Sequence, residues 1–299
     1  MVIKKIQGVI APVFVPFLAN GEIDYDKYTS NLEKYNEDLL TGFFVISSVG
    51  EYPFLTEKEK LKLIELTVQI ADRNKLILVG TGLESTLETI KLTNKAAALG
   101  ADTALIMTPS FYKNKINNQV LTSHYREVAA KTDIPILIYN VPQFTNINIA
   151  VEVVHALSRE PNIIGIKESS PEFARLIDLK KHLPANFNIL AGLASLWYPA
   201  LTLGIEAGIF GLANLAANEF TGILEAYRMG NSNEAYDIFM RMFPVVNAIE
   251  KHYGTPGIKF AAELAGFEGG EVRRPLLPLS AEEKDDLRKM LAAAKLFRE

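Results

Sequence analysis

A lysine ends a run of apolar residues in the middle of the chain. Ile163, Ile164 and Ile166 precede Lys167 in a segment whose composition is typical of a buried strand. Alternate side chains of a strand share a face, so we expect Lys167 to lie on the same face as Gly165, whose missing side chain leaves room. A buried amine that is partly neutral can attack a carbonyl and form a Schiff base. The alternative is an ordinary lysine that reaches solvent from the end of a strand.

An imine-forming lysine needs a group that moves protons, and a phenol can do so. Tyr139 ends the apolar segment 136–139, one expected strand before Lys167. Consecutive strands of a parallel barrel are neighbours, so we expect the two side chains to lie close together. A core tyrosine with a satisfied hydroxyl is the alternative.

A small polar segment, Ser47–Gly50, follows the second expected strand. The hydroxyl of Ser48 could relay protons. The backbone N–H groups of Ser48 and Val49 could hold a carboxylate in a nest beside Gly50. Serine and glycine are also common in ordinary loops, so composition alone leaves both readings open.

Short β-rich apolar runs alternate with amphipathic helical stretches along the chain. The eight expected strands are Gly8–Phe17, Gly42–Ser47, Lys75–Gly80, Ala101–Thr108, Ile134–Asn140, Asn162–Ser169, Asn186–Gly192 and Ala207–Asn214. Between them, Lys58–Ala71 and Leu87–Leu99 carry helical spacing. This alternation predicts parallel βαβ units, and eight units close into a (β/α)₈ TIM barrel of about 250 residues.

The end of the chain reads as further helices. Ser232–Lys251, Pro256–Ala265 and Ser280–Phe297 have helical patterns, with Ser280 as an N-cap. We therefore predict an α/β barrel over residues 1–230. A C-terminal helical extension over 231–299 is expected to pack on it, as one structural unit.

In such barrels the active site lies at the C-terminal ends of the strands. In this chain, polar residues and glycines stand at or just after the C-terminal ends of nearly all the expected strands. They are Ser47, Ser48, Gly50, Glu51, Thr81, Tyr112, Tyr139, Lys167, Ser169, Gly192 and Asn214. This convergence favours a catalytic Lys167 over a solvent-exposed one.

Composition excludes several other classes of protein. The chain has 299 residues, 48% hydrophobic content and a net charge of −4, which gives no electrostatic footprint for nucleic acid or an anionic membrane. Cysteine is absent, which excludes disulfides and thiolate chemistry. No apolar stretch is close to the length of a membrane-spanning helix, which needs about 20 residues. The first residues do not have the pattern of a signal peptide. We expect a cytoplasmic protein that binds small molecules.

Metal and cofactor chemistry have little support in the sequence. The four histidines, at positions 124, 155, 182 and 252, all fall in expected helices, so no metal site is predicted. Glycines at Gly192 and Gly211 follow the last two strands, where many barrels bind phosphate. Neither loop carries a basic side chain, so pyridoxal phosphate and other phosphate-bearing cofactors are not expected.

These motifs resemble a known family. Ser48-Val49-Gly50-Glu51, Tyr112, Tyr139-Asn140-Val141-Pro142 and Gly165-Ile166-Lys167-Glu168-Ser169 are similar, in order and spacing, to the dihydrodipicolinate synthase/N-acetylneuraminate lyase family of pyruvate-dependent class I aldolases. The resemblance covers essentially the whole chain. It implies that Lys167 forms the Schiff base with pyruvate and that Tyr139 is the acid/base phenol. Ser48 then connects Tyr139 to Tyr112 of a neighbouring subunit.

The same resemblance implies a set of substrate-binding residues and an assembly. The residues are Ser47, Val49, Gly50, Ser169, Gly192, Phe144 and Asn214. Among them, Gly192 and the Gly211–Asn214 loop are expected to line the pyruvate end. The assembly expected by analogy is a homotetramer built as a dimer of dimers.

Departures from the family pattern bear on the second substrate. Phe144 stands where dihydrodipicolinate synthases carry an arginine for the carboxylate of their semialdehyde substrate. Val49 replaces a threonine of the usual Gly-Thr-Thr-Gly-Glu. The segment Thr108–Asn114 is longer before its tyrosine than in typical synthases. It resembles the 4-hydroxy-2-oxoglutarate and 2-keto-3-deoxy sugar acid aldolases more closely.

The resemblance leaves several reactions open. We favour reversible cleavage of a 2-keto-3-deoxy sugar acid, of the 2-keto-3-deoxygluconate type, to pyruvate and an aldehyde. A 4-hydroxy-2-oxoglutarate aldolase is the alternative, since Lys113 and Lys115 could supply the cation that glyoxylate needs. Dihydrodipicolinate synthase and N-acetylneuraminate lyase rank below these. A pyruvate-binding regulatory barrel is the non-enzyme alternative.

Overall fold

The computed structural model describes residues 5–297. Eight parallel strands form one closed barrel in chain order. They are β1 (Gly8–Pro12), β2 (Gly42–Val45), β3 (Leu76–Gly80), β4 (Thr103–Met107), β5 (Ile136–Asn140), β6 (Ile163–Glu168), β7 (Asn188–Ala191) and β8 (Ala207–Ile209). Each strand lies inside a predicted segment, so the predicted TIM barrel is confirmed.

Helices occupy the stretches between the strands and the end of the chain. They are α1 (Tyr25–Glu37), α2 (Glu57–Ile70), α3 (Thr86–Leu99), α4 (Asn118–Lys131), α5 (Pro142–Thr145), α6 (Val151–Leu157), α7 (Phe173–His182), α8 (Trp197–Thr202), α9 (Ala217–Arg228), α10 (Ser232–Ala248), α11 (Gly254–Leu264) and α12 (Ala281–Ala293). The predicted cap of α12 is confirmed, because Ser280 Oγ accepts from the N–H of Glu283. Over residues 5–297, no helix is long and apolar enough to cross a membrane.

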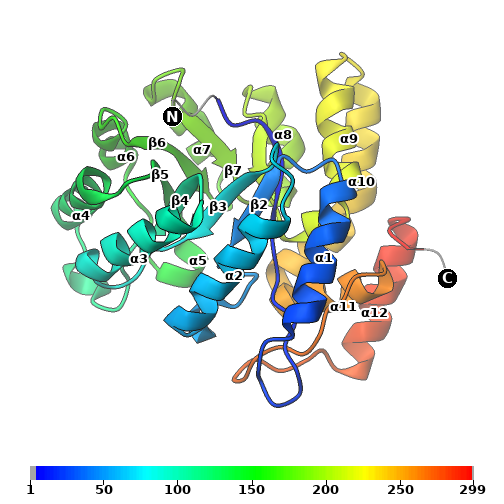
Figure 1. Cartoon of the computed structure of the whole chain (residues 1–299). Coiled ribbons are helices and arrows are strands. Elements are labelled where there is room, and N and C mark those ends of the chain that lie inside the picture. The colour runs from blue at the N-terminus through cyan, green and yellow to red at the C-terminus, as the bar shows by residue number, and fades with distance from the viewer. Residues whose placement is uncertain (1–4, 298–299) are drawn as a thin grey trace. The chain divides into compact units, whose positions relative to one another are not determined.

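The chain divides into two compact units. The first comprises residues 77–209 and the N-terminal residues up to Gln7. In this unit β4, β5 and β6 pair side by side, in the green part of Figure 1. Outside them, α4 packs against α3 and α6. The strands of this unit carry Tyr139 and Lys167, and the β5–β6 register sets these two residues opposite each other.

The second unit comprises Gly8–Leu76 and the chain from Phe210 onward. In it β1 pairs with β2, and α9 packs against β1 and against α10. Helices α9 and α10 are the two yellow helices of Figure 1. Helix α12 packs against α10 and α11, so the C-terminal helices form one layer within this unit. The boundary that we predict at residue 230 stays a prediction.

The eighth strand is shorter than predicted. It ends at Ile209 instead of Asn214, because Gly211–Asn214 coil into a 3₁₀ turn, η4. The side chain of Asn214 closes this turn, with Nδ2 donating to the carbonyl of Gly211 at 2.7 Å and to that of Pro12 at 3.0 Å. Its Oδ1 accepts from the hydroxyl of Tyr35. The polar end of the predicted strand is therefore a capped turn.

Gly165 lets β6 pack tightly, and this can be tested. A Cβ at this position would lie 2.4 Å from the backbone oxygen of Asn188 and 2.7 Å from Cδ2 of Leu137. We therefore expect Gly165→Ala to lower the free energy of unfolding by about 1–3 kcal/mol, as overpacking does.

The matched control is Gly222→Ala in α9, where the nearest side-chain atom to a Cβ is Ile238 Cδ1 at 3.8 Å. Alanine should stabilise the helix there by about 0.5–1 kcal/mol. Urea denaturation measures both variants. Unchanged stability of Gly165→Ala would contradict the close packing of β6.

Candidate active site

Lys167 and Tyr139 face each other from adjacent strands. They are register partners in the β5–β6 pair, and Lys167 Nζ lies 4.2 Å from the centre of the Tyr139 ring. Lys167 is only 4% exposed, and Tyr139 is buried as well. The predicted neighbourhood is confirmed, and the solvent-reaching lysine is excluded. The tyrosine ring covers one side of the amine, so water has little access to it from that side.

The space beside Lys167 differs from the prediction. The gap expected at Gly165 is already filled by the side chain of Leu137 and the backbone of Asn188. The glycine therefore serves the close approach of β5, β6 and β7. It leaves no open volume for a substrate.

The residues next to Lys167 and Tyr139 hold the two strand ends together. Asn140 Nδ2 donates to Glu168 Oε1 at 2.8 Å, and the backbone N–H of Ser170 donates to the same oxygen at 2.8 Å. Arg175 Nε donates to Glu168 Oε2 at 2.6 Å. The Glu168 side chain is fully buried, and Arg175 is the cation that pairs with it. This clamp, formed by Asn140, Glu168 and Arg175, fixes β5 to β6 one residue beyond Tyr139 and Lys167.

The clamp also fastens the loop that follows β5. Asn140 Oδ1 accepts from the backbone N–H of Ile149 at 3.0 Å, and Arg175 Nη2 donates to the Ile149 carbonyl at 2.5 Å. Sequence reasoning assigned no role to the three clamp residues. Two acidic or polar residues at the ends of buried strands were a usable signal for Asn140 and Glu168. Arg175 lies in α7 and carries no local signal.

Three buried hydroxyl groups follow strands of the first unit without a hydrogen-bond partner in the described chain. They are Thr108 Oγ1, Ser169 Oγ and Ser170 Oγ. Gly192 packs against Ser169, since a Cβ there would lie 1.9 Å from its Oγ. A buried polar atom without a partner is unfavourable unless a ligand or water satisfies it. These hydroxyls are candidates for ligand contacts, and the substrate-binding roles of Ser169 and Gly192 stay predictions.

In the second unit, the segment Ser47–Gly50 forms a tight turn after β2. Ser47 Oγ accepts from the N–H of Gly50 at 3.1 Å, and the N–H of Glu51 donates to the Ser48 carbonyl at 3.1 Å. The N–H groups of Ser48 and Val49 make no hydrogen bond with any described residue. Two adjacent free donors at a turn are typical of an anion-binding nest.

Another buried lysine, Lys259, pairs with the residue that follows this turn, and sequence reasoning missed it. Lys259 Nζ is 2.6 Å from Glu51 Oε1, and the two side chains are 3% and 1% exposed. Burial lowers the pKa of Lys259 to about 8, although the nearby carboxylate of Glu51 opposes this shift. The available signal was a charged residue between Ile258 and Phe260 in an apolar helical segment.

Two predicted site residues are strongly exposed. Tyr112 is 71% exposed, and its ring makes an edge contact with Phe111 at 5.0 Å between centroids. The carboxylate of Glu84 accepts from the N–H groups of Ser110 and Phe111, at 2.9 Å each, and so anchors this loop. Phe144 is 58% exposed on the short helix α5. Their catalytic and binding roles stay predictions.

Asn214 is fully buried, and its amide groups are hydrogen-bonded within the second unit. Asn214 would therefore influence ligand binding only indirectly, through the conformation of the turn that it closes.

Within the described residues, no three His, Cys, Asp or Glu side chains are grouped as metal ligands would be. The histidines lie in α4, α6, α7 and the π-helical turn η5 (Ile249–Tyr253), as the sequence predicts.

Comparisons with known proteins agree over the length of the chain. A family model described as the dihydrodipicolinate synthetase family matches residues 5–294. The 4-hydroxy-tetrahydrodipicolinate synthase of Methanothrix thermoacetophila is 34% identical over 288 residues, which is 95% of this chain and 96% of that relative.

Solved structures give the same result. The 4-hydroxy-tetrahydrodipicolinate synthase of Methylacidiphilum fumariolicum SolV superposes with a TM-score of 0.92 at 32% identity, over 97% of this chain and 96% of that one. A structure described as the first monomeric dihydrodipicolinate synthase variant gives a TM-score of 0.91 at 29% identity, over 98% of each chain.

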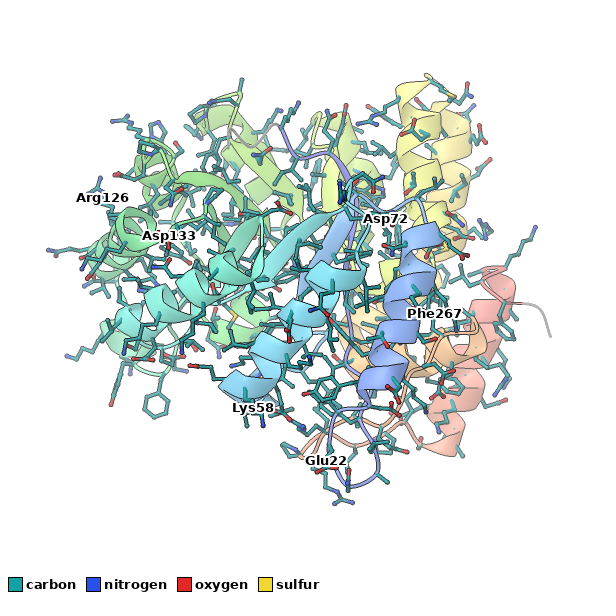
Figure 2. All side chains as sticks on the ribbon, in the orientation of Figure 1. Glu22, Lys58, Asp72, Arg126, Asp133 and Phe267 are labelled. Atoms are coloured by element: carbon teal, nitrogen blue, oxygen red, sulfur yellow. The ribbon has the colours of Figure 1, made fainter. Side chains whose placement is uncertain are left out.

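The clamp makes a prediction about stability. Arg175→Met leaves the Glu168 carboxylate buried without its cation, and breaking such a pair costs about 3–5 kcal/mol. The matched control is Arg126→Met. Arg126 pairs with Glu160 at 2.8 Å but is 53% exposed, and it projects from the outer side of α4 (Figure 2). Its loss should cost less than about 1 kcal/mol. Urea denaturation measures both. Equally small losses would show that the clamp contributes little.

Proposed function

Because the chain belongs to the dihydrodipicolinate synthetase family of pyruvate-dependent class I aldolases, we propose that it reversibly cleaves a 2-keto-3-deoxy sugar acid to pyruvate and an aldehyde. The substrate is of the 2-keto-3-deoxygluconate type. The buried contact of Lys167 with Tyr139 supports the Schiff-base chemistry. The single observation that carries the choice of substrate is Phe144, which offers no cation to a second carboxylate.

The reaction begins at Lys167. Its neutral amine attacks the C2 ketone of the substrate to give a carbinolamine, which loses water to become an imine. Each step moves a proton to or from oxygen or nitrogen. Tyr139 is the group in contact with the amine, so we assign it these proton transfers.

Cleavage then uses the imine as an electron sink. A base removes the proton of the C4 hydroxyl, the C3–C4 bond breaks, and its electron pair passes into the enamine while C4 leaves as the aldehyde. The enamine takes a proton at C3, and hydrolysis releases pyruvate and the free amine. We propose that Ser48 and Tyr112 relay protons to and from Tyr139 in these steps.

The carboxylate of the keto acid is assigned to the Ser47–Gly50 turn. Ser48 and Val49 offer adjacent free N–H groups there. Val49 supplies no hydroxyl, so recognition would depend on backbone donors, which act as fixed partial positive charges. Ser47 and Gly50 shape the turn through their mutual hydrogen bond.

The aldehyde half is assigned to neutral polar groups. The hydroxyls of Thr108, Ser169 and Ser170 lack partners in the described chain and can hydrogen-bond to the hydroxyl groups of a sugar acid. A carboxylate-bearing aldehyde would instead need a cation such as Lys113 or Lys115. These two lysines keep a 4-hydroxy-2-oxoglutarate aldolase as an alternative.

A second candidate has support of a different kind. The relatives of this chain carry the name 4-hydroxy-tetrahydrodipicolinate synthase. The same imine and enamine chemistry would serve that reaction, with a different aldehyde. Phe144 argues against it, because it stands where synthases carry the arginine for the semialdehyde carboxylate.

We propose that copies of this chain assemble through the exposed loop that carries Phe111 and Tyr112. Aromatic side chains this exposed are typical of interfaces. A homotetramer in which Tyr112 serves a neighbouring subunit would bury them. One similar structure is described as a monomeric variant, so assembly varies among these proteins.

The Schiff base is tested by trapping. Incubation with pyruvate and borohydride should give a stable adduct on the peptide that carries Lys167, detected by mass spectrometry. Lys167→Ala should give no adduct and no turnover, and Tyr139→Phe should slow turnover by about 10²–10⁴-fold. Circular dichroism checks that both variants fold. A folded wild-type protein without an adduct would favour the pyruvate-binding barrel.

The acceptor is tested by comparing substrates. Pyruvate release from 2-keto-3-deoxygluconate should exceed condensation of pyruvate with aspartate semialdehyde. Phe144→Arg adds the missing cation and should raise the kcat/KM for the semialdehyde at least tenfold. Phe144→Gln, which adds no charge, is the matched control. A faster reaction of the wild-type protein with the semialdehyde would favour the second candidate.

A further inference from the structure

We propose that Lys259 is a positioning residue of the active site, and that its ion pair with Glu51 holds the Ser47–Gly50 turn in its ligand-binding conformation. The inference rests on the proposed function, because it explains how the proposed carboxylate site is kept in shape. Neither residue donates to the ligand itself. All of the groups involved lie in the second compact unit.

The ion pair joins the turn directly to α11. Lys259 Nζ lies 2.6 Å from Glu51 Oε1, and both side chains are almost completely buried. No donor in the described chain makes a well-aligned hydrogen bond to this oxygen. The other carboxylate oxygen, Oε2, accepts from the backbone N–H of Arg273 at 2.8 Å. Lys259 is therefore the cation that pairs with Glu51 Oε1.

The backbone of the turn needs such a restraint. Glu51 has φ of +56° and Ile46 has φ of +57°, so left-handed residues other than glycine stand at both ends of the turn. Conformations of this kind cost about 1–3 kcal/mol each and persist only where the surroundings enforce them. Gly50 leaves little freedom, since a Cβ there would lie 3.0 Å from the Val13 carbonyl. The side chain of Glu51, through its contacts with Lys259 and Arg273, holds the turn in this conformation.

Lys259 is itself rigidly held. Nζ donates to the carbonyl of Glu271 at 2.6 Å and lies 4.6 Å from the centre of the Phe17 ring. The guanidinium of Arg273 contacts the same ring at 4.4 Å and pairs with Glu59 at 2.6 Å. The amine is therefore fixed from several segments, and a shift of Lys259 would be transmitted to Glu51.

Stability alone does not explain this pair. A well-packed apolar replacement of a buried ion pair is often neutral or stabilising. Glu51 is also the residue that directly follows the two free N–H donors and Gly50. A buried ion pair that is attached to the carboxylate site, at a position where an apolar pair could serve stability as well, fits a positioning role.

Titration of Lys259 gives a distinguishing signature. The charged groups that face it are Glu51, Arg273 and Glu271, and its pKa is lowered to about 8, chiefly by burial. An unfolded lysine has a pKa near 10.5, so between about pH 8 and 10.5 the unfolded state binds more protons. Stability therefore does not fall as pH rises through this window, although the ion pair loses its cation. Pyruvate affinity should fall there without unfolding.

The test compares Lys259→Met, Glu51→Gln and the double variant. Each single variant leaves one partner buried alone and should lose stability, whereas the double variant should recover it. Hydrogen exchange of the 47–54 segment should nevertheless be at least tenfold faster in all three than in the wild-type protein. The KM for pyruvate should rise at least tenfold at pH 7, with a smaller change in kcat. The matched control is Lys75→Met, a buried lysine that donates to the carbonyls of Asp38 and Leu40.

Two results would overturn the inference. If the double variant recovers stability, slow exchange and pyruvate affinity together, the pair has only a structural role. If Lys75→Met speeds exchange of the 47–54 segment equally, the effect is not specific to Lys259. Failure of the proposed function looks different: the wild-type protein would then form no pyruvate adduct, while exchange of the turn would still report on the ion pair.

Discussion

The burial of polar and ionisable side chains is the constraint on which the rest of the structure depends. Lys167 is one of them: only 4% of this residue is exposed, and a charged amine is poorly solvated at such a position. Its surroundings come from the same unit: the ring of Tyr139 faces the amine, and the strands pack closely at Gly165.

Both compact units pair a buried carboxylate with a basic residue in the same way. In each, a buried carboxylate directly follows the residues assigned to the ligand: Glu168 comes after Lys167, and Glu51 comes after Gly50. Each carboxylate is bound by a basic residue from a later segment, Arg175 in one unit and Lys259 in the other. In both units, the residue that holds the strand end or turn in place is thus the acidic neighbour of the residues that we propose to contact the ligand.

The sequence predicted what depends on local pattern. Strand periodicity gave the eight strands and the opposition of Tyr139 and Lys167, because parallel βαβ units leave few other topologies. It could not predict Arg175 or Lys259, since their partners are remote in the chain and only the fold brings them together. At Gly165 the sequence predicted open space beside the lysine, but a missing side chain can equally allow close approach of the strands, as it does here. The predicted eighth strand was too long, because the side chain of Asn214 closes a turn after Ile209.

The surface position of Phe144 has an evolutionary consequence. The residue stands on a four-residue helix outside the packed strands, and most of its side chain meets solvent. Exchange at this exposed site is less restricted by packing than exchange at Gly165 or Glu168, which are both buried. Under the proposed function, single substitutions at this position would change the choice of aldehyde without altering Lys167 or Tyr139. A barrel built in this way could acquire new aldehyde substrates through changes at its surface, with its buried strands left as they are.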